Sequence, residues 1–206
     1  MTSRNKANLT AVIGSTGSGK SLWIKRQLKR KPSRLMVWDP MREYGQLAGP
    51  LTDASHVIAH LATCGSSGGF TLVFQPSHHP KIAAKQFDLL CCAAMAAGRC
   101  TLVAEELASV TRAGYSPPGW LRVVTQGRHA GLTVIGTTQR PALIDKTFLD
   151  NATTVRCGRL NTAAGRRYMA DLLDVPAETL AGLKPLEWVS KDMATGKLTR
   201  EKLATT

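Results

Sequence analysis

Eight consecutive residues near the start of the chain have the types and spacing of a phosphate-binding loop. They fit G-x-x-x-x-G-K-[ST] at every fixed position and stand between a predicted strand and a predicted helix. In such a loop the backbone N–H groups converge on phosphate oxygens, a lysine reaches the outer phosphates and a hydroxyl binds Mg²⁺. The sequence therefore predicts a site for ATP and Mg²⁺; the alternative is an accidental Gly/Ser-rich turn. The predicted nucleotide ligands are Gly14, Ser15, Thr16, Gly17, Ser18, Gly19, Lys20 and Ser21, the last of them also a magnesium ligand.

Two adjacent carboxylates could complete this site. Glu105 and Glu106 directly follow the apolar run 101–104. In such a pair the first acid holds Mg²⁺, often through water, and the second orients the attacking water as a general base. Neighbouring residues of a regular strand point to opposite faces, so both acids can serve only if the strand ends there. The alternative is a pair of solvated acids at the start of a helix.

Two further polar residues flank the apolar run 132–135. Gln139 lies in TTQRP, just after this run, where an amide could sense the terminal phosphate or simply form a turn. Arg128 lies in GRHAG, just before the run. It could act as an arginine finger in the site of a neighbouring subunit, or it could be an ordinary surface arginine.

The charge balance favours a polyanionic partner. Lys and Arg number 27 against 14 Asp and Glu, which gives a net charge of +13. A surplus of this size on one domain attracts nucleic acid, although an evenly basic surface would have the same composition.

His56 and His60, four residues apart and followed by Cys64, are interpreted as ordinary helix residues rather than a metal site. The five cysteines show no C-x-x-C pairing and indicate reduced thiols.

These candidate residues require strands that end in loops at one edge of a sheet. Short apolar runs alternate with helical patterns, which predicts an α/β fold with a mostly parallel central sheet flanked by helices. A C-terminal β-hairpin turning at 194–196 is also expected. The predicted strands are 9–13, 35–38, 70–74, 101–104, 132–135 and 153–157, and the predicted helices are 20–31, 81–97, 120–129 and 163–173.

The length of 206 residues suits one domain, with a core at about 7–160 and additions at about 161–206. No run of residues is long and apolar enough to span a bilayer, and the opening segment MTSRNKANLT lacks the apolar core of a signal peptide. We therefore expect no membrane insertion and a location in the cytoplasm of the cell.

Five segments, taken in order, resemble the FtsK/HerA superfamily of DNA-pumping ATPases. They are GSTGSGKS, VWDPMREYG, TLVAEEL, GRHAGLTVIGTTQRP and VRCGRLNTAAGRRYMADLL. The resemblance implies a RecA-like P-loop NTPase core and a homo-oligomer, a hexameric ring that threads double-stranded DNA. It also implies that Gln139 is the sensor and that Arg128 is the finger supplied in trans. Contact with DNA phosphates should be independent of base sequence. In loop 111–119, Arg112 offers a positive charge and Tyr115 a ring on which a base can stack. The alternative is that this exposed loop has no part in DNA binding.

The lack of anchors and DNA-reading additions makes the chain most similar to the genome-packaging ATPases of tailless, internal-membrane icosahedral viruses. This resemblance implies capsid or portal-vertex partners and a place at the packaging vertex. The alternatives are another FtsK/HerA-type pump for conjugation or segregation, a P-loop kinase of a small metabolite, and a non-catalytic nucleotide switch or virion structural protein. Two departures from the family pattern are Glu105 in place of Asp, and Asn161 where an acid is common. Asp39 is a possible site neighbour without an assigned role.

Overall fold

The computed structural model describes residues 8–30 and 32–204 of the chain. Its central sheet has eight strands in the order β3-β2-β4-β5-β1-β6-β7-β8. The first six in this order are parallel to their neighbours, whereas β7 and β8 are antiparallel. The expected α/β fold with a mostly parallel sheet is therefore confirmed. The strands are β1 (Asn8–Ile13), β2 (Arg34–Trp38), β3 (Phe70–Phe74), β4 (Thr101–Ala104), β5 (Thr133–Thr138), β6 (Thr154–Gly158), β7 (Glu187–Asp192) and β8 (Leu198–Lys202).

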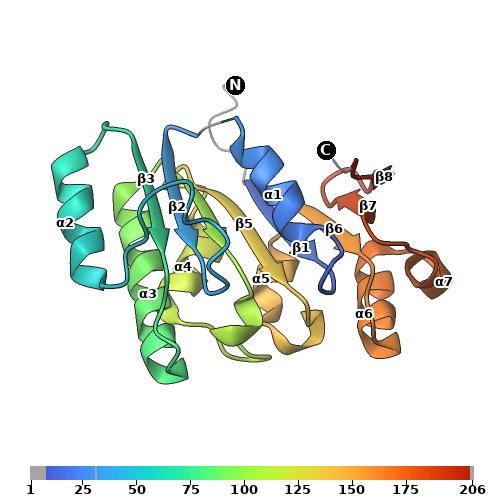
Figure 1. Ribbon diagram of the computed structural model, residues 1–206. Helices are drawn as coiled ribbons and strands as arrows, with labels where there is room; N and C mark the ends of the chain where they lie inside the picture. The colour runs from blue at the N-terminus through green and yellow to red at the C-terminus, as the bar shows by residue number, and fades with distance from the viewer. Residues whose placement is uncertain (1–7, 31, 205–206) are drawn as a thin grey trace.

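Helices cover the two faces of this sheet unequally. One face packs against α2 to α6 through a large apolar cluster, in which Trp38, Phe87, Trp120 and Phe148 contact one another in succession. The other face carries α1, which lies across the middle of the sheet in Figure 1. The helices are α1 (Lys20–Leu28), α2 (Ala54–Cys64), α3 (Pro80–Ala97), α4 (Pro118–Gln126), α5 (Lys146–Asp150), α6 (Ala163–Leu173) and α7 (Ala177–Ala181), with 3₁₀ turns η1 (Leu107–Ser109) and η2 (Pro141–Leu143).

Several boundaries differ from the predicted ones. The strand predicted at 132–135 runs from Thr133 to Thr138, because it pairs with β1 along the whole length of that strand. The helix predicted at 120–129 ends at Gln126, before Gly127, and begins at Pro118, whose fixed φ suits a first turn. The helix predicted at 20–31 ends at Leu28, and Lys31 lies outside the described residues, as do the first seven residues of the opening segment MTSRNKANLT.

The expected C-terminal hairpin is confirmed. β7 and β8 pair antiparallel on either side of a turn that includes Gly196, which has a φ of +70°. The hairpin does not form a separate layer, because β7 also pairs with β6 and so extends the main sheet at the end opposite β3 (Figure 1). Within the described part of the chain, no helix has both the length and the apolar character needed to cross a bilayer.

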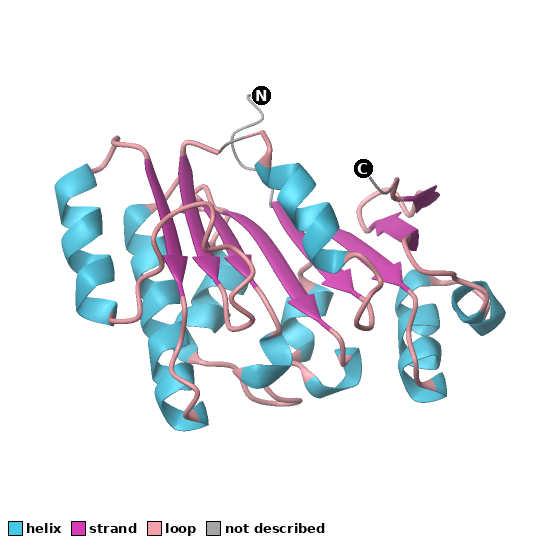
Figure 2. Cartoon of the chain, viewed as in Figure 1, coloured by secondary structure: helices cyan, strands magenta, loops and turns pink. Residues whose placement is uncertain are grey.

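The parallel strands all deliver their following residues to one edge of the sheet. In Figure 2 the arrowheads of β1 to β6 point to the same edge. The phosphate loop follows β1, Asp39 follows β2, the two glutamates follow β4, and Gln139 follows β5. Ligands of open α/β sheets bind at the carboxyl ends of the strands, so the fold places the candidate chemistry where such a sheet binds ligands.

Candidate functional site

The phosphate loop is held by the two strands that flank β1. The Gly14 N–H donates to the Thr138 carbonyl of β5 at 3.2 Å, and the Ser15 N–H donates to the Arg159 carbonyl after β6 at 2.8 Å. A Cβ at Gly14 would lie 2.5 Å from Ser18 Oγ, so a larger residue there would displace the Ser18 side chain. Gly17 and Gly19 have φ values of +76° and +95°, a region that side-chain-bearing residues rarely adopt. Gly17 and Gly19 are therefore required by the backbone path of the loop.

Lys20, the first residue of α1, points back into the loop. Its Nζ donates to the Gly14 carbonyl at 2.8 Å and to the Ser15 carbonyl at 3.2 Å. Burial lowers the pKa of this amine, and the nearby Glu106 and Glu105 carboxylates oppose that effect. The amine thus donates inside the loop to two carbonyl groups that a phosphate oxygen can replace.

The two adjacent acids separate because β4 ends at Ala104. Glu106 has a φ of +49°, in the left-handed region, so the chain leaves the alternating pattern of a strand between the two residues. Glu105 is only 4% exposed and accepts a 2.7 Å hydrogen bond from the Tyr44 hydroxyl. Burial raises the pKa of Glu105 to about 7. Both acids could serve one site only if the strand ended at this point. The strand does end there.

Glu106 is oriented by the end of β5. Its N–H donates to Thr137 Oγ1 at 3.1 Å, and its Oε1 accepts from Thr138 Oγ1 at 3.4 Å and from the Gln139 N–H at 3.5 Å. The side-chain Oε1 of Gln139 accepts a 2.8 Å hydrogen bond from Thr16 Oγ1 of the phosphate loop. Gln139 therefore connects the phosphate loop to the second acid.

These groups enclose one cavity of about 280 Å³. Four of its lining residues were not singled out from the sequence: Met41, Glu43, Leu22 and Thr137. Glu43 belongs to VWDPMREYG, so the resemblance of that segment was the available signal. The cavity is lined by Thr16, Gly17, Gly19, Lys20, Ser21, Leu22, Met41, Glu43, Glu105, Glu106, Thr137 and Gln139.

Asp39, which the sequence left without a role, shapes the turn that lines this cavity. It is fully buried, and its carboxylate accepts from the Glu43 N–H at 2.8 Å and from the Tyr44 N–H at 3.0 Å. Both oxygens are thus used by the backbone, and Asp39 does not line the cavity. Its contact with the site is indirect, through the residues it holds.

The chemistry of the cavity lining fits ATP with Mg²⁺. Mg²⁺ prefers oxygen ligands and binds through one or two carboxylates together with substrate phosphates. Ser21 and Glu105 supply such oxygens at one cavity, and Lys20 supplies a cation for the phosphates. In residues 8–30 and 32–204 no group of three or more His, Cys, Asp or Glu side chains is placed to hold a metal ion.

Arg128 is not brought to this cavity. It lies after α4 and before β5, exposed, with its Nε donating to His129 Nε2 at 3.3 Å. Because β5 runs from Thr133 to Thr138, Arg128 stands at the amino edge of the sheet, about 20 Å from the phosphate loop by strand rise. It therefore cannot reach the nucleotide site of its own chain.

The two candidate DNA contacts lie in the loop between η1 and α4. The backbones of Arg112 and Tyr115 pair with each other, with N–H to carbonyl distances of 3.0 and 2.9 Å. Both residues are exposed, Tyr115 by 54%. The loop follows β4 and so leaves the same edge of the sheet as the two acids, but neither side chain lines the nucleotide cavity.

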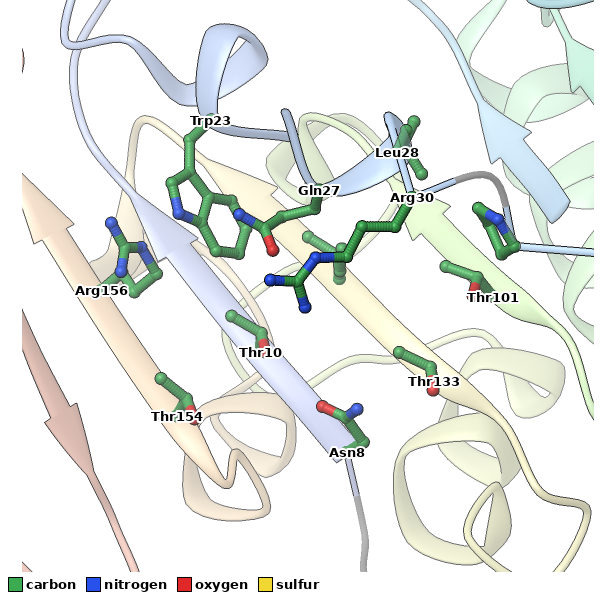
Figure 3. Close-up of a pocket in the computed structure, with 12 residues that line it drawn as sticks. Asn8, Thr10, Trp23, Gln27, Leu28, Arg30, Thr101, Thr133, Thr154 and Arg156 are labelled. Carbon is green, nitrogen blue, oxygen red and sulfur yellow. The ribbon is translucent and has the colours of Figure 1, made fainter. Parts of the chain in front are cut away.

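A separate hollow of about 380 Å³ lies on the α1 face near the amino ends of the strands. Figure 3 shows Thr10, Thr133 and Thr154 on neighbouring strands beneath Trp23 and Arg30 of the α1 segment. None of the predicted site residues lines it. The hollow is therefore distinct from the phosphate site.

No protein-family model matches the chain. Protein P9 of Pseudoalteromonas phage PM2 is 30% identical over 179 residues, which cover 84% of this chain and 78% of that protein. The genome packaging NTPase B204 of Sulfolobus turreted icosahedral virus 2, in complex with ATP-gammaS, has a TM-score of 0.79 at 19% identity, covering 99% of this chain and 100% of B204. The N-terminal domain of zonular occludens toxin from Neisseria meningitidis has a TM-score of 0.56 at 14% identity, covering 97% and 95% of the two chains. The two solved structures share the fold.

Proposed function

The chain belongs to the family of Protein P9 of Pseudoalteromonas phage PM2. From this premise we propose that it is a P-loop ATPase of the FtsK/HerA superfamily and that it packages a viral genome. It hydrolyses ATP to ADP and phosphate and uses the free energy to move double-stranded DNA into a preformed capsid. The similarity of its fold to the genome packaging NTPase B204 supports this assignment over conjugation or segregation.

One observation carries the proposal: a phosphate loop, two carboxylates and an amide from three separate segments surround a single cavity. The glycine-rich loop and Lys20 hold the phosphates, while Ser21 and Glu105 hold the magnesium ion. Glu106 accepts the proton of the attacking water. Magnesium, when bound with ATP, neutralises charge on the phosphate oxygens.

Glu106 and Gln139 suit a role in sensing the terminal phosphate. Gln139 bonds to Thr16 in the phosphate loop through its side chain and to Glu106 through its backbone N–H. When phosphate is released, a shift of the phosphate loop at Thr16 can therefore move Glu106 through Gln139 alone. This connection supports Gln139 as the sensor, since an ordinary turn residue would not join the two groups.

The position of Arg128 supports a ring. A guanidinium at the amino edge of one subunit can complete a nucleotide site only when it meets the carboxyl edge of another, which is a head-to-tail contact. Such contacts form a ring when the rotation between subunits closes, and a hexamer is the ring that the resemblance implies. Loop 111–119 then presents Arg112 and Tyr115 toward DNA, and capsid or portal-vertex proteins dock the ring at the packaging vertex, reached from the host cytoplasm.

The proposal is tested by phosphate release from ATP by the purified chain, with and without long double-stranded DNA at low salt. We expect DNA to stimulate turnover and added salt to remove the stimulation, because the contacts are to phosphates. Lys20→Ala serves as the inactive control. Turnover that ignores DNA, together with no DNA binding, would reject translocation, and transfer of phosphate to a small metabolite would indicate a kinase.

A further inference from the structure

Tyr44 is a fully buried side chain that reaches one of the two acids of the site. Its hydroxyl donates to Glu105 Oε1 at 2.7 Å. Its ring packs in the apolar cluster between the sheet and α1, and Lys25 Nζ lies 5.4 Å from the centre of the ring. The ring is thus fixed on all sides, and the hydroxyl has a defined direction.

The backbone that carries Tyr44 is also fixed. The Asp39 carboxylate accepts from the N–H groups of Glu43 and Tyr44, at 2.8 and 3.0 Å. The Asp39 N–H donates to the Phe74 carbonyl of β3 at 2.8 Å, which ties the start of the turn to the sheet. Asp39, the turn and Tyr44 therefore form a continuous connection from β2 to the Glu105 carboxylate.

A connection of this kind matters because Glu105 stands where the family usually has aspartate. Glutamate has one more rotatable bond, so its carboxylate can occupy more positions and loses more conformational entropy when it is held in one. A hydrogen bond from a rigid donor removes that freedom before a ligand binds. Side chains that donate a hydrogen bond to a metal-ligating residue typically orient it in this way.

We propose that Tyr44 is a positioning residue, which holds the Glu105 carboxylate in place for the divalent cation that accompanies ATP, and that Asp39 fixes Tyr44. This inference rests on the proposed function, because it assumes that the cavity binds ATP with Mg²⁺. It assigns a role in cation binding to two residues that do not line the cavity.

The test measures binding rather than turnover. Affinity for a non-hydrolysable ATP analogue is measured by calorimetry across a range of Mg²⁺ concentrations, for the wild type and for Tyr44→Phe. The variant is expected to need about tenfold more Mg²⁺ for half-maximal enhancement of binding, with unchanged affinity in the absence of Mg²⁺. Tyr168→Phe, a tyrosine on α6 away from the cavity, is the matched control and should behave as the wild type.

A second pair of variants separates positioning from stability. In a Glu105→Gln background there is no carboxylate to orient, so Tyr44→Phe should cause no further loss of Mg²⁺ dependence. Asp39→Asn should weaken Mg²⁺ binding in the same direction as Tyr44→Phe, which keeps the idea testable if Tyr44→Phe folds poorly. An equal effect of Tyr44→Phe in both backgrounds, or a lower melting temperature with wild-type Mg²⁺ dependence, would overturn the role.

The outcomes also distinguish this inference from the proposed function. Failure of the wild type to bind the analogue with Mg²⁺ would defeat the proposed function, and the positioning role with it. Tight Mg²⁺-dependent binding by the wild type, unchanged in Tyr44→Phe and Asp39→Asn, would defeat the positioning role alone.

Discussion

Glu105 and Glu106 are neighbours in the chain, yet their surroundings give them different properties. Glu105 is buried against Tyr44, whereas Glu106 is only partly buried and faces the Thr138 and Gln139 end of β5. One acid is therefore held rigidly and the other remains accessible to water. This difference matches the division of labour between a metal ligand and a base, and it arises from the left-handed turn at Glu106.

Glu106→Gln is expected to bind ATP but not to release phosphate. The amide keeps the size of the side chain but cannot accept a proton, and loss of a general base typically lowers a rate by about 10² to 10⁴. Retained nucleotide, measured after gel filtration with ATP and Mg²⁺, checks the prediction. Glu178→Gln in α7 is the control, and wild-type turnover in Glu106→Gln would exclude the base role.

The stability of the nucleotide-free protein should depend on pH through Glu105. Its folded-state pKa is raised to about 7 from the usual glutamate value of 4.5, so the protonated form is favoured in the folded state. The favourable contribution is therefore complete below about 4.5 and is lost as the pH rises to about 7, up to about 3 kcal/mol in total. Denaturant unfolding of the wild type against Glu105→Gln should show this loss. The same pH dependence in both proteins would contradict it.

At the scale of elements, the strands that position the site could be predicted, because buried parallel strands are continuous apolar runs. Their ends could not be predicted so well. β5 continues through Gly136 and two threonines, since pairing with β1 outweighs the weak strand preference of glycine. The turn from Asp39 to Tyr44 has no periodic pattern, so its contact with Glu105 depended on tertiary structure and was not visible in the sequence.

The close contact between α3 and α4 depends on Gly119. A Cβ there would lie 2.5 Å from the Asp88 backbone carbonyl, and backbone cannot move away cheaply. Gly119→Ala should therefore lower the free energy of unfolding by about 1 to 3 kcal/mol. Gly182→Ala, where the nearest atom would lie at 3.5 Å, is the control and should change it by less than about 0.5 kcal/mol. Equal stabilities of the two variants, measured by denaturant titration, would contradict the prediction.

At the scale of the whole molecule, the C-terminal hairpin is close to the phosphate loop. A Cβ at Gly19 would lie 2.7 Å from Leu186 Cδ2, and one at Gly14 would lie 3.5 Å from the Trp188 ring. The sequence indicated a hairpin but not this contact, because nothing in the alternation of β7 and β8 shows which strand they join. The sheet therefore extends past the phosphate loop on the β6 side, and the hairpin supports the loop from there.

The positions of Arg128 and the phosphate loop at opposite edges lead to a prediction about mixed assemblies. When Arg128→Ala subunits are mixed with wild type, each variant removes the finger from its neighbour's site rather than from its own. If one broken site stops a six-membered ring, equal amounts should leave roughly 2% of the activity rather than half. ATP turnover with DNA is measured across mixing ratios, with Arg122→Ala, an exposed arginine of α4, as the control. Activity that falls in proportion to the variant fraction would contradict a coupled ring that depends on a finger supplied in trans.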